Sequence, residues 1–185
     1  MSRLRELRRR IGRQEGYSLI EMLTVMIILG VVLSGLTTLF VQGSNAELDM
    51  NNRFSAQQEA RLALDKLRRE AHCASGVTAS SSSSVTLTLA SYCPTGNGSV
   101  TWCTVAATGS TTRYGLYRKT GATCDSTGVR FADYLTTGSV FTFTAQSTTS
   151  LAKLHVDFPV NVKPKKSVES YELVDDIVLR NSTRS

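Results

Sequence analysis

The sequence predicts an α+β protein in which one long N-terminal helix packs against a C-terminal antiparallel β-sheet. Three observations lead to this prediction. An uncharged apolar run of 20 residues occupies 22–41, and a segment without glycine or proline follows at 46–71. The rest of the 185-residue chain is rich in Thr, Ser, Val and aromatic residues. Short runs in this last part alternate between apolar and polar residues, which is typical of half-buried strands.

Residues 1–16 form a basic leader. They contain six arginines and two glutamates, a net charge of +4, while the whole chain carries +6, which leaves +2 for residues 17–185. The positive-inside rule therefore predicts a cytoplasmic leader and an exported C-terminal domain. Because most of the positive charge is a topology signal, the composition indicates no specific nucleic-acid partner.

Residues 17–45 are predicted to cross the membrane as a helix. At about 1.5 Å per residue, Met22 to Val41 extends about 30 Å, the thickness of a bilayer core. A secretory signal is the alternative, with Ser44-Asn45-Ala46 as a cleavage site. Such signals have an apolar region of only about 7–15 residues, which is shorter than this run. Glu21 at the head of the run needs a partner, because a carboxylate beside an apolar span is costly.

The segment from Gly16 to Val31, GYSLIEMLTVMIILGV, resembles the N-terminal signature of type IV pilin-like proteins, the pilins and pseudopilins. In that family a membrane prepilin peptidase cleaves after the leader glycine and methylates the new N-terminus. The resemblance therefore implies cleavage after Gly16 and N-methylation of Tyr17. The acid at the fifth mature position of the family corresponds to Glu21, and a frequent glycine at the fourteenth corresponds to Gly30.

The resemblance implies a pilin-like fold and a structural role. Tyr17 replaces the commoner phenylalanine, and Thr38 stands where many major pilins have proline, which favours a minor pilin or pseudopilin. The expected machine is a type IV pilus or a related type II secretion or competence filament. The implied partners are prepilin peptidase, other pilin or pseudopilin subunits, the inner-membrane assembly platform and membrane lipid. The expected location is the cytoplasmic membrane, as a single-pass protein with an extracytoplasmic head, and the filament after assembly.

The family mechanism has a physical basis in two of these residues. Cleavage after Gly16 creates a positive amine on Tyr17, and subunits staggered along a filament can place this amine against Glu21 of a neighbour. Two unit charges about 4 Å apart attract by about 4 kcal/mol at an effective dielectric constant of about 20, before desolvation is subtracted. The expected role of Glu21 is to set the stagger between subunits, because any other stagger leaves its carboxylate unpaired.

The helix is predicted to continue through residues 46–76, ending near His72, with Gly76 as a stop signal. Within the span, Gly30 and Ser34 form a small-residue pair that permits close helix approach, with Thr24 and Thr38 on the same slightly polar stripe. Further along, one apolar face is predicted to cover the sheet, formed by Met50, Phe54, Ala60, Leu64 and Leu67. The wetter sides are predicted to carry Arg61, Asp65, Arg68 and Glu70.

Residues 77–185 are predicted to form the β-rich head. The candidate strands are Val85–Ala90, Val100–Ala106, Arg113–Lys119, Val140–Ala145, Ala152–Val162 and Glu172–Arg180. Val156, Phe158 and Val160 alternate with polar residues or proline, which predicts a half-buried strand. Pro159 places that strand at an edge or at an irregularity of the sheet. Ser80 to Ser84 is predicted to be a turn.

All four cysteines lie beyond the span: Cys73, Cys93, Cys103 and Cys124. Four cysteines outside a membrane predict two disulfides, with three possible connectivities. A hairpin of residues 99–106 and 113–119 would bring Cys93 and Cys124 to one open end, which leaves Cys73 to pair with Cys103. A metal site is the alternative, but no C-x-x-C spacing occurs, and His72 and His155 stand apart. We therefore expect no metal.

The sequence contains no recognisable catalytic motif, and we expect neither an enzyme nor a cofactor. It has two histidines and no phosphate-binding loop or nucleophile motif. Asp175 and Asp176 are neighbours on a predicted strand and should point to opposite faces. Trp102, the sole tryptophan, is expected in the core. The alternative to a filament subunit is a signal-anchored extracytoplasmic binding domain that is never assembled into a filament.

Overall fold

The computed structural model describes residues 17–163 and 170–180. Within these residues the chain forms one long helix, α2 (Leu19–Cys73), followed by eight strands. The chain divides into two compact units, one ending at Leu48 and the other beginning at Asp49. The predicted leader, 1–16, lies outside the described residues. The α+β class is confirmed, with one N-terminal helix and a curled antiparallel sheet.

The strands follow the helix without a linker. β1 begins at Ala74, directly after the last residue of α2, so Gly76 lies within a strand. The eight strands are β1 (Ala74–Ser81), β2 (Ser84–Leu89), β3 (Gly98–Ala106), β4 (Tyr114–Thr120), β5 (Val129–Leu135), β6 (Phe141–Thr144), β7 (Lys153–Val160) and β8 (Tyr171–Val178). Six of them correspond to predicted strands, whereas β1 and β5 were not predicted.

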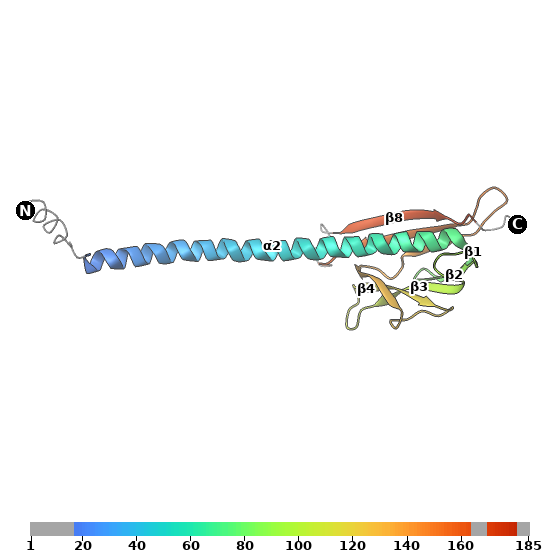
Figure 1. The fold of residues 1–185 in the computed structure, drawn as a ribbon, viewed down its shortest axis with the longest axis horizontal. Helices are drawn as coiled ribbons and strands as arrows, with labels where there is room; N and C mark the ends of the chain where they lie inside the picture. Colours follow the sequence, from blue (N-terminus) through green and yellow to red (C-terminus); the bar gives the residue numbers. More distant parts are fainter. Residues whose placement is uncertain (1–16, 164–169, 181–185) are drawn as a thin grey trace, which may run out of the picture. The chain divides into compact units, whose positions relative to one another are not determined.

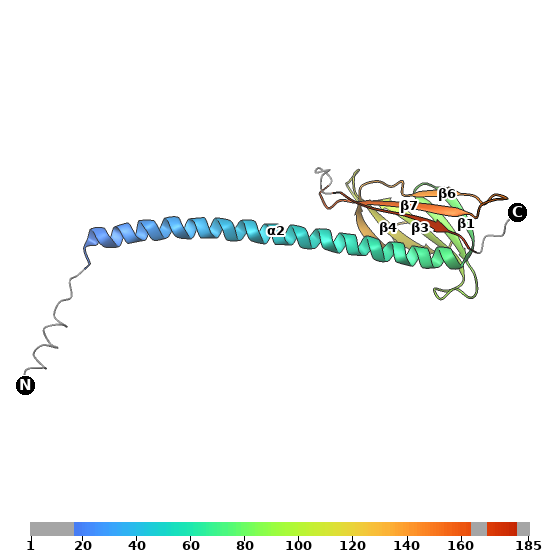
Figure 2. The ribbon, with the colours of Figure 1, turned by 90° about the horizontal axis from the view of Figure 1, so that it is seen from above.

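The sheet is antiparallel throughout and consists of two groups of strands. Strands β1 to β5 pair in sequence order, and β7 pairs with both β6 and β8. The groups are joined where Leu135 of β5 pairs with Val160 of β7. The sheet curls so that its two ends, β1 and β6, approach each other (Figure 2). At this contact the N–H of Phe141 in β6 donates to the carbonyl of Ser82 in the β1–β2 turn (2.9 Å).

Strand β7 lies inside the sheet, so the edge position inferred from Pro159 is wrong, whereas the irregularity is present. On one side β7 pairs with β8 along its whole length, with Pro159 opposite Glu172. On the other side β6 covers the strand up to Val156, and β5 pairs only at Val160. Pro159 occupies the interval between these two partners, where a ladder hydrogen bond from its own nitrogen is not required. The alternating burial predicted for β7 is confirmed.

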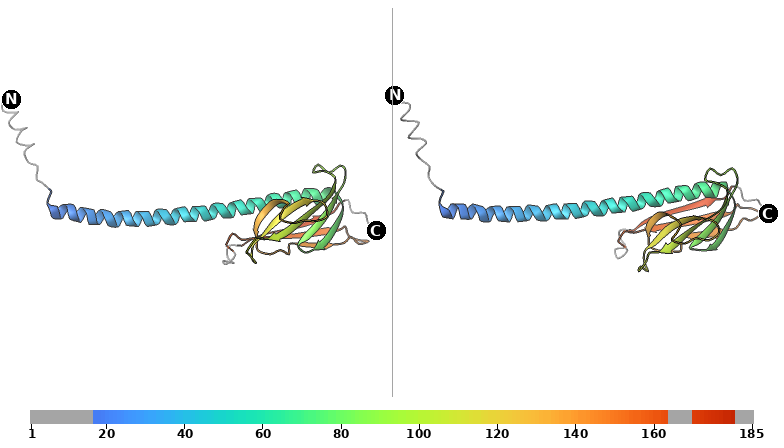
Figure 3. Two further views of the ribbon diagram at one scale, coloured as in Figure 1. Left: turned by 90° about the horizontal axis from the view of Figure 1, so that it is seen from below. Right: turned by 60° about the horizontal axis from the view of Figure 1, so that its bottom comes forward.

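The C-terminal part of α2 lies between the two groups of strands. Figure 1 shows it running between β8 on one side and β3 and β4 on the other, and Figure 3 shows the curled sheet along it. On the β8 side, Arg68 binds Asp175 (2.7 Å) and Arg61 donates to the hydroxyl of Tyr171 (2.9 Å). Asp176 points away from the helix and contacts His155 (2.7 Å). The opposite orientations predicted for the two neighbouring aspartates are therefore confirmed.

The buried face of α2 differs from the predicted one at its N-terminal end. Met50 and Phe54 are 73% and 58% exposed. The residues that the helix buries are Ala56, Ala60, Ala63, Leu64, Leu67, Glu70 and Ala71. At about 100° per residue, the ten positions from Phe54 to Leu64 miss a whole number of turns by about 80°. Phe54 is therefore rotated away from the face that Leu64 and Leu67 present to the sheet.

The position of Glu70 also differs from the prediction. It was predicted on a wetter side of the helix, but its side chain has no exposure at all. Its carboxylate accepts a hydrogen bond from Trp102 Nε1 (2.9 Å) and pairs with Arg118 (2.9 Å). Trp102 is fully buried, as predicted for a core residue, with its ring 5.0 Å from that of Phe131. A charged group thus lies within the apolar core.

Both predicted disulfides are present, but the predicted pairing is wrong. Cys73 pairs with Cys93, and Cys103 pairs with Cys124. The first pair follows from β1, which the prediction lacked. The β1–β2 hairpin places Ala74 opposite Leu89 and so returns the chain to the end of the helix just before Cys93.

The second disulfide closes the loop after β4. Cys103 lies opposite Tyr117 in the β3–β4 ladder, and residues 121–128 fold back to bring Cys124 to it. The same loop is held by Asp125, which accepts hydrogen bonds from Lys119 and from the hydroxyl and N–H of Thr127. These bonds, with that from Lys119 first, lower the pKa of Asp125 to about 2. The carboxylate therefore stays ionised across the ordinary pH range.

Leu67 and Leu62 provide a matched test of the observed helix face. Leu67 is fully buried, while Leu62 on the same helix is 66% exposed. We expect Leu67→Ala to lower the free energy of unfolding by about 2–5 kcal/mol, because it leaves a cavity in the core. Leu62→Ala should change it by less than about 0.5 kcal/mol. Urea unfolding of the detergent-solubilised chain, followed by Trp102 fluorescence, measures both. Equal losses of stability would contradict this assignment of faces.

Candidate functional site

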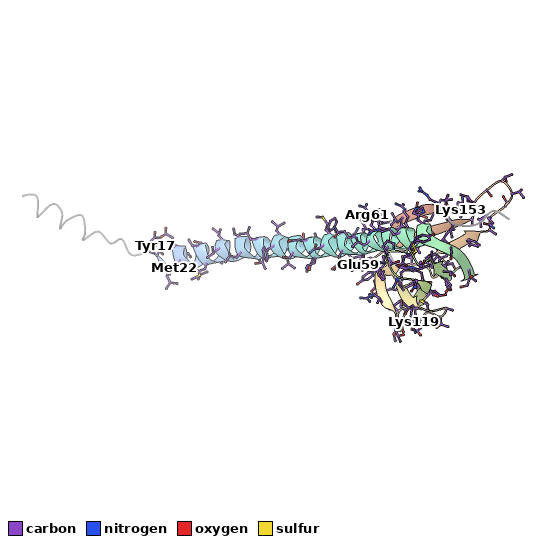
Figure 4. The ribbon with its side chains drawn as sticks, turned by 45° about the vertical axis from the view of Figure 1, so that its right-hand side comes forward. Tyr17, Met22, Glu59, Arg61, Lys119 and Lys153 are labelled. Atoms are coloured by element: carbon purple, nitrogen blue, oxygen red, sulfur yellow. A yellow bond between two sulfur atoms is a disulfide. The ribbon has the colours of Figure 1, made fainter. Side chains whose placement is uncertain are left out.

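The candidate site is the start of α2, where the chain passes from residues without regular structure into the helix. The carbonyl of Ser18 accepts hydrogen bonds from the N–H groups of Glu21 (2.9 Å) and Met22 (3.1 Å). Ser18 therefore closes the first turn as the residue before the helix. Tyr17 precedes this turn and is exposed, and Figure 4 labels it together with Met22.

Glu21 lies in the first turn of α2. A carboxylate is favoured there by the partial positive charge of the helix N-terminus. Within residues 17–163 and 170–180, its side chain forms no hydrogen bond or ion pair. The chain brings Tyr17 and Glu21 into neighbouring positions of one helix start, but it supplies no counter-charge for Glu21 from the described residues.

The apolar run after Glu21 is entirely exposed. The helix is long and apolar enough to cross a membrane, and the most apolar part of it has no buried residue. At the start of α2 a shallow apolar hollow is lined by Leu19, Met22, Leu23, Met26 and Ile27. Exposed side chains of this kind are stable in lipid or against another apolar helix, and unfavourable in water.

The hydroxyl groups of the run are satisfied within the helix. Each of the four donates to a carbonyl one turn earlier: Thr24 to Glu21 (2.9 Å), Ser34 to Val31 (2.8 Å), Thr37 to Leu33 (2.8 Å) and Thr38 to Ser34 (2.9 Å). An unbonded hydroxyl is costly to remove from water, and these bonds offset that cost. The slightly polar stripe predicted from the sequence is therefore compatible with an apolar environment.

Gly30 is not required by the packing of this chain. A Cβ atom added there meets nothing within 4 Å apart from the adjoining helix backbone, and the same holds for Gly35. Its backbone has ordinary helical geometry, so no positive φ demands glycine. Gly30 and Ser34 together leave a low strip on the helix surface, where a second backbone can approach closely.

The described residues offer little for metal or catalytic chemistry. Among residues 17–163 and 170–180, no group of three or more His, Cys, Asp or Glu side chains could hold a metal ion. The four cysteines are all in disulfides. At the head of the apolar run 22–41 the described residues place one carboxylate, that of Glu21.

Comparison with known proteins identifies the same segment. Residues 11–37 match the family described as the prokaryotic N-terminal methylation motif. The match contains the four residues singled out in the sequence: Gly16, Tyr17, Glu21 and Gly30. No curated protein and no solved structure matches the chain. The motif and the long apolar helix support a type IV pilin-like protein that is anchored in a membrane.

Sequence reasoning located this segment but missed two of its features. Gly16 lies outside the described residues, whereas Tyr17 precedes α2, Glu21 lies in its first turn and Gly30 lies further along the helix. The hydroxyl of Thr37 and the apolar hollow that begins at Leu19 were not predicted. The signal for both was the helical spacing, since residues three and four apart share a face.

The internal hydrogen bonds of the run lead to a test of the membrane span. Val31→Lys should reduce stable membrane insertion, since a charge at the helix centre costs about 2.5–3.5 kcal/mol on insertion scales. Thr37→Val removes a hydroxyl that already bonds to its own helix, and it should leave insertion unchanged. Resistance to alkaline extraction from membranes measures the inserted fraction. A Val31→Lys chain retained as fully as the Thr37→Val chain would contradict a bilayer location.

Proposed function

We propose that this chain is a minor pilin or pseudopilin of a type IV pilus or a related type II secretion or competence filament. It is cleaved by prepilin peptidase after Gly16, methylated on Tyr17 and assembled through its N-terminal helix with other pilin subunits. The observation that carries the proposal is the methylation motif at 11–37, placed directly at the head of an exposed apolar helix.

The geometry of Glu21 supports the assembly step. Its carboxylate lies in the first turn of α2 and lacks a partner among the described residues. The amine that cleavage would create on Tyr17 of a neighbouring subunit has the opposite charge. A pair of this kind, formed in an apolar layer, favours one stagger of subunits, because every other stagger leaves two unpaired charges in that layer.

The low strip at Gly30 and Ser34 supports the same proposal. Among the described residues no side chain packs against Gly30, so its lack of a side chain leaves room for a neighbour. The apolar hollow from Leu19 to Ile27 offers such a neighbour a complementary surface. Before assembly, the helix would contact membrane lipid and the inner-membrane assembly platform.

The form of the mature N-terminus tests the processing step. We expect the intact mass of the membrane-purified protein to correspond to a chain that starts at Tyr17 and carries one additional methyl group. Sequencing by fragmentation places that group on the terminal amine. A chain that starts at Glu47 would indicate an ordinary signal peptidase instead. A chain that still contains the leader would favour the signal-anchored binding domain, and either result would overturn the proposal.

The assembly step is tested by Glu21→Ala, with Glu47→Ala as the matched control on the same helix. Glu21→Ala should leave membrane insertion and cleavage intact but reduce incorporation into sheared filaments at least about tenfold, the equivalent of about 1.4 kcal/mol of lost pairing. Glu47 lies beyond the apolar run, so Glu47→Ala should assemble normally. Quantitative blotting of the filament and membrane fractions gives both values. Normal incorporation of the Glu21→Ala chain would refute the role given to this carboxylate.

A further inference from the structure

Strand β8 forms an open edge of the sheet. It pairs with β7 along all eight of its residues, and no described strand pairs with its other side. Figure 1 shows it running alongside the C-terminal part of α2. Its pairing with β7 has no register shift, whereas the pairing of β1 with β2 contains two. A regular open edge of this kind is a position where another extended chain can add to a sheet.

The register determines which backbone groups of β8 point outward. On one side of β7, the N–H of Asp157 donates to the carbonyl of Val140 (3.0 Å), so the odd-numbered residues of β7 face β6. On the other side, the N–H of Leu179 donates to the carbonyl of Ala152 (2.9 Å). Backbone bonds alternate along an antiparallel pair. The odd-numbered residues of β8 therefore bond to β7, and the even-numbered ones point away from it.

Three of the outward-pointing residues, Glu172, Val174 and Asp176, have free backbone groups. Within residues 17–163 and 170–180, none of their N–H or carbonyl groups has a hydrogen-bond partner. All three residues are exposed, and Val174 is 53% accessible. The next outward carbonyl, that of Val178, accepts a hydrogen bond from His72 Nδ1 (3.2 Å), which closes the edge at that end. The open part spans five residues, or about 17 Å of extended chain.

The charges on this edge indicate which kind of chain fits it. β8 contains three acids and no lysine or arginine. Asp175 and Asp176 pair with Arg68 and His155 (both 2.7 Å), whereas Glu172 has no partner among the described residues. The outward face of the open part therefore presents an apolar side chain between two acids, and one of these acids has no counter-charge.

A second copy of β8 is a poor partner for this edge. An antiparallel pairing that matches the three open positions of two copies places Glu172 of each opposite Asp176 of the other. Like charges directly opposite each other are destabilising, and the β8 sequence YELVDDIV offers no cation for either acid. A strand with basic residues opposite the two acids and an apolar residue opposite Val174 has complementary charge and pairs favourably.

We propose that the open edge of β8 binds an extended segment of another protein, in which basic residues flank an apolar one at alternate positions. The backbone of this segment bonds to Glu172, Val174 and Asp176, and its cations lie opposite the two acids. Binding at this edge does not depend on assembly of the chain into a filament.

Two peptides with blocked ends test the proposal, Lys-Thr-Val-Thr-Lys and Glu-Thr-Val-Thr-Glu. Each is titrated to about 5 mM into the ¹⁵N-labelled full chain in micelles of an uncharged detergent. We expect the lysine peptide to shift the amide signals of Glu172, Val174 and Asp176 saturably and to slow their hydrogen exchange. The glutamate peptide should bind at least about tenfold more weakly. No saturable binding of the lysine peptide, or equal binding of the two peptides, would overturn the proposal.

Glu172→Lys and Glu59→Lys are a matched pair, since each reverses one exposed acid of the head. Figure 4 shows Glu59 on the other side of α2 from Arg61, which contacts Tyr171 of β8. Glu172→Lys should weaken binding of the lysine peptide at least about fivefold, as expected for one cross-strand charge pair, and strengthen binding of the glutamate peptide. Glu59→Lys should change neither affinity. Equal effects of the two substitutions would contradict the assigned edge.

Val174→Pro tests the backbone contact separately. The N–H of Val174 faces the open side, so proline is tolerated there, but it removes the central donor and blocks the edge. Binding of the lysine peptide should be lost while Trp102 fluorescence stays unchanged, and retained binding would overturn the proposal. The charge reversal decides alone if this variant does not fold. Protection of the three amides that rises with protein concentration, without peptide, would assign the edge to a second copy and refute the basic partner.

Discussion

The head depends on the coverage of one helix face by a curled sheet. The covered face of α2 runs from Ala56 to Ala71, and both groups of strands contact it, β3 and β4 on one flank and β8 on the other. The two groups are joined by the pairing of Leu135 with Val160 and by backbone bonds beside it, from the N–H of Thr136 to the carbonyl of Pro159 and from the N–H of Asn161 to the carbonyl of Tyr134. The covered helix face adds buried apolar contact to the sheet, and the hydrophobic effect acts at this layer.

The polar side chains of the two parts of α2 obtain their hydrogen bonds in different ways. In the apolar run 22–41 the four hydroxyls bond to carbonyls of their own helix, and the Glu21 carboxylate at its head has no partner among the described residues. After Asp49, Glu70 is satisfied by side chains from distant strands. Each part thus has one exceptional acid. One is paired within the chain, and the proposed partner of the other belongs to a neighbour.

The fold class and the N-terminal segment were predictable from the sequence, because both depend on local patterns. The helix is recognisable from its apolar run, from the segment 46–71 without glycine and from the absence of proline between Leu19 and Cys73, and the motif around Gly16 is contiguous. Strand β1 was missed because ASGVTASS has no clear alternation, and β5 because its pairing with β4 contains irregularities that break the period of two. The wrong disulfide pairing followed from the missing β1. Glu70 was placed in water because its partners lie 32 and 48 residues away, beyond any local pattern.

The two disulfides have a consequence for when the subunit matures. Each joins cysteines only 20 or 21 residues apart, and all four sulfur atoms belong to the unit that begins at Asp49. Cross-linking therefore needs no contribution from residues 17–48. Under the proposed function, covalent locking and polymerisation are then separable events, and a stock of fully oxidised monomers could accumulate in the bilayer before any fibre is started.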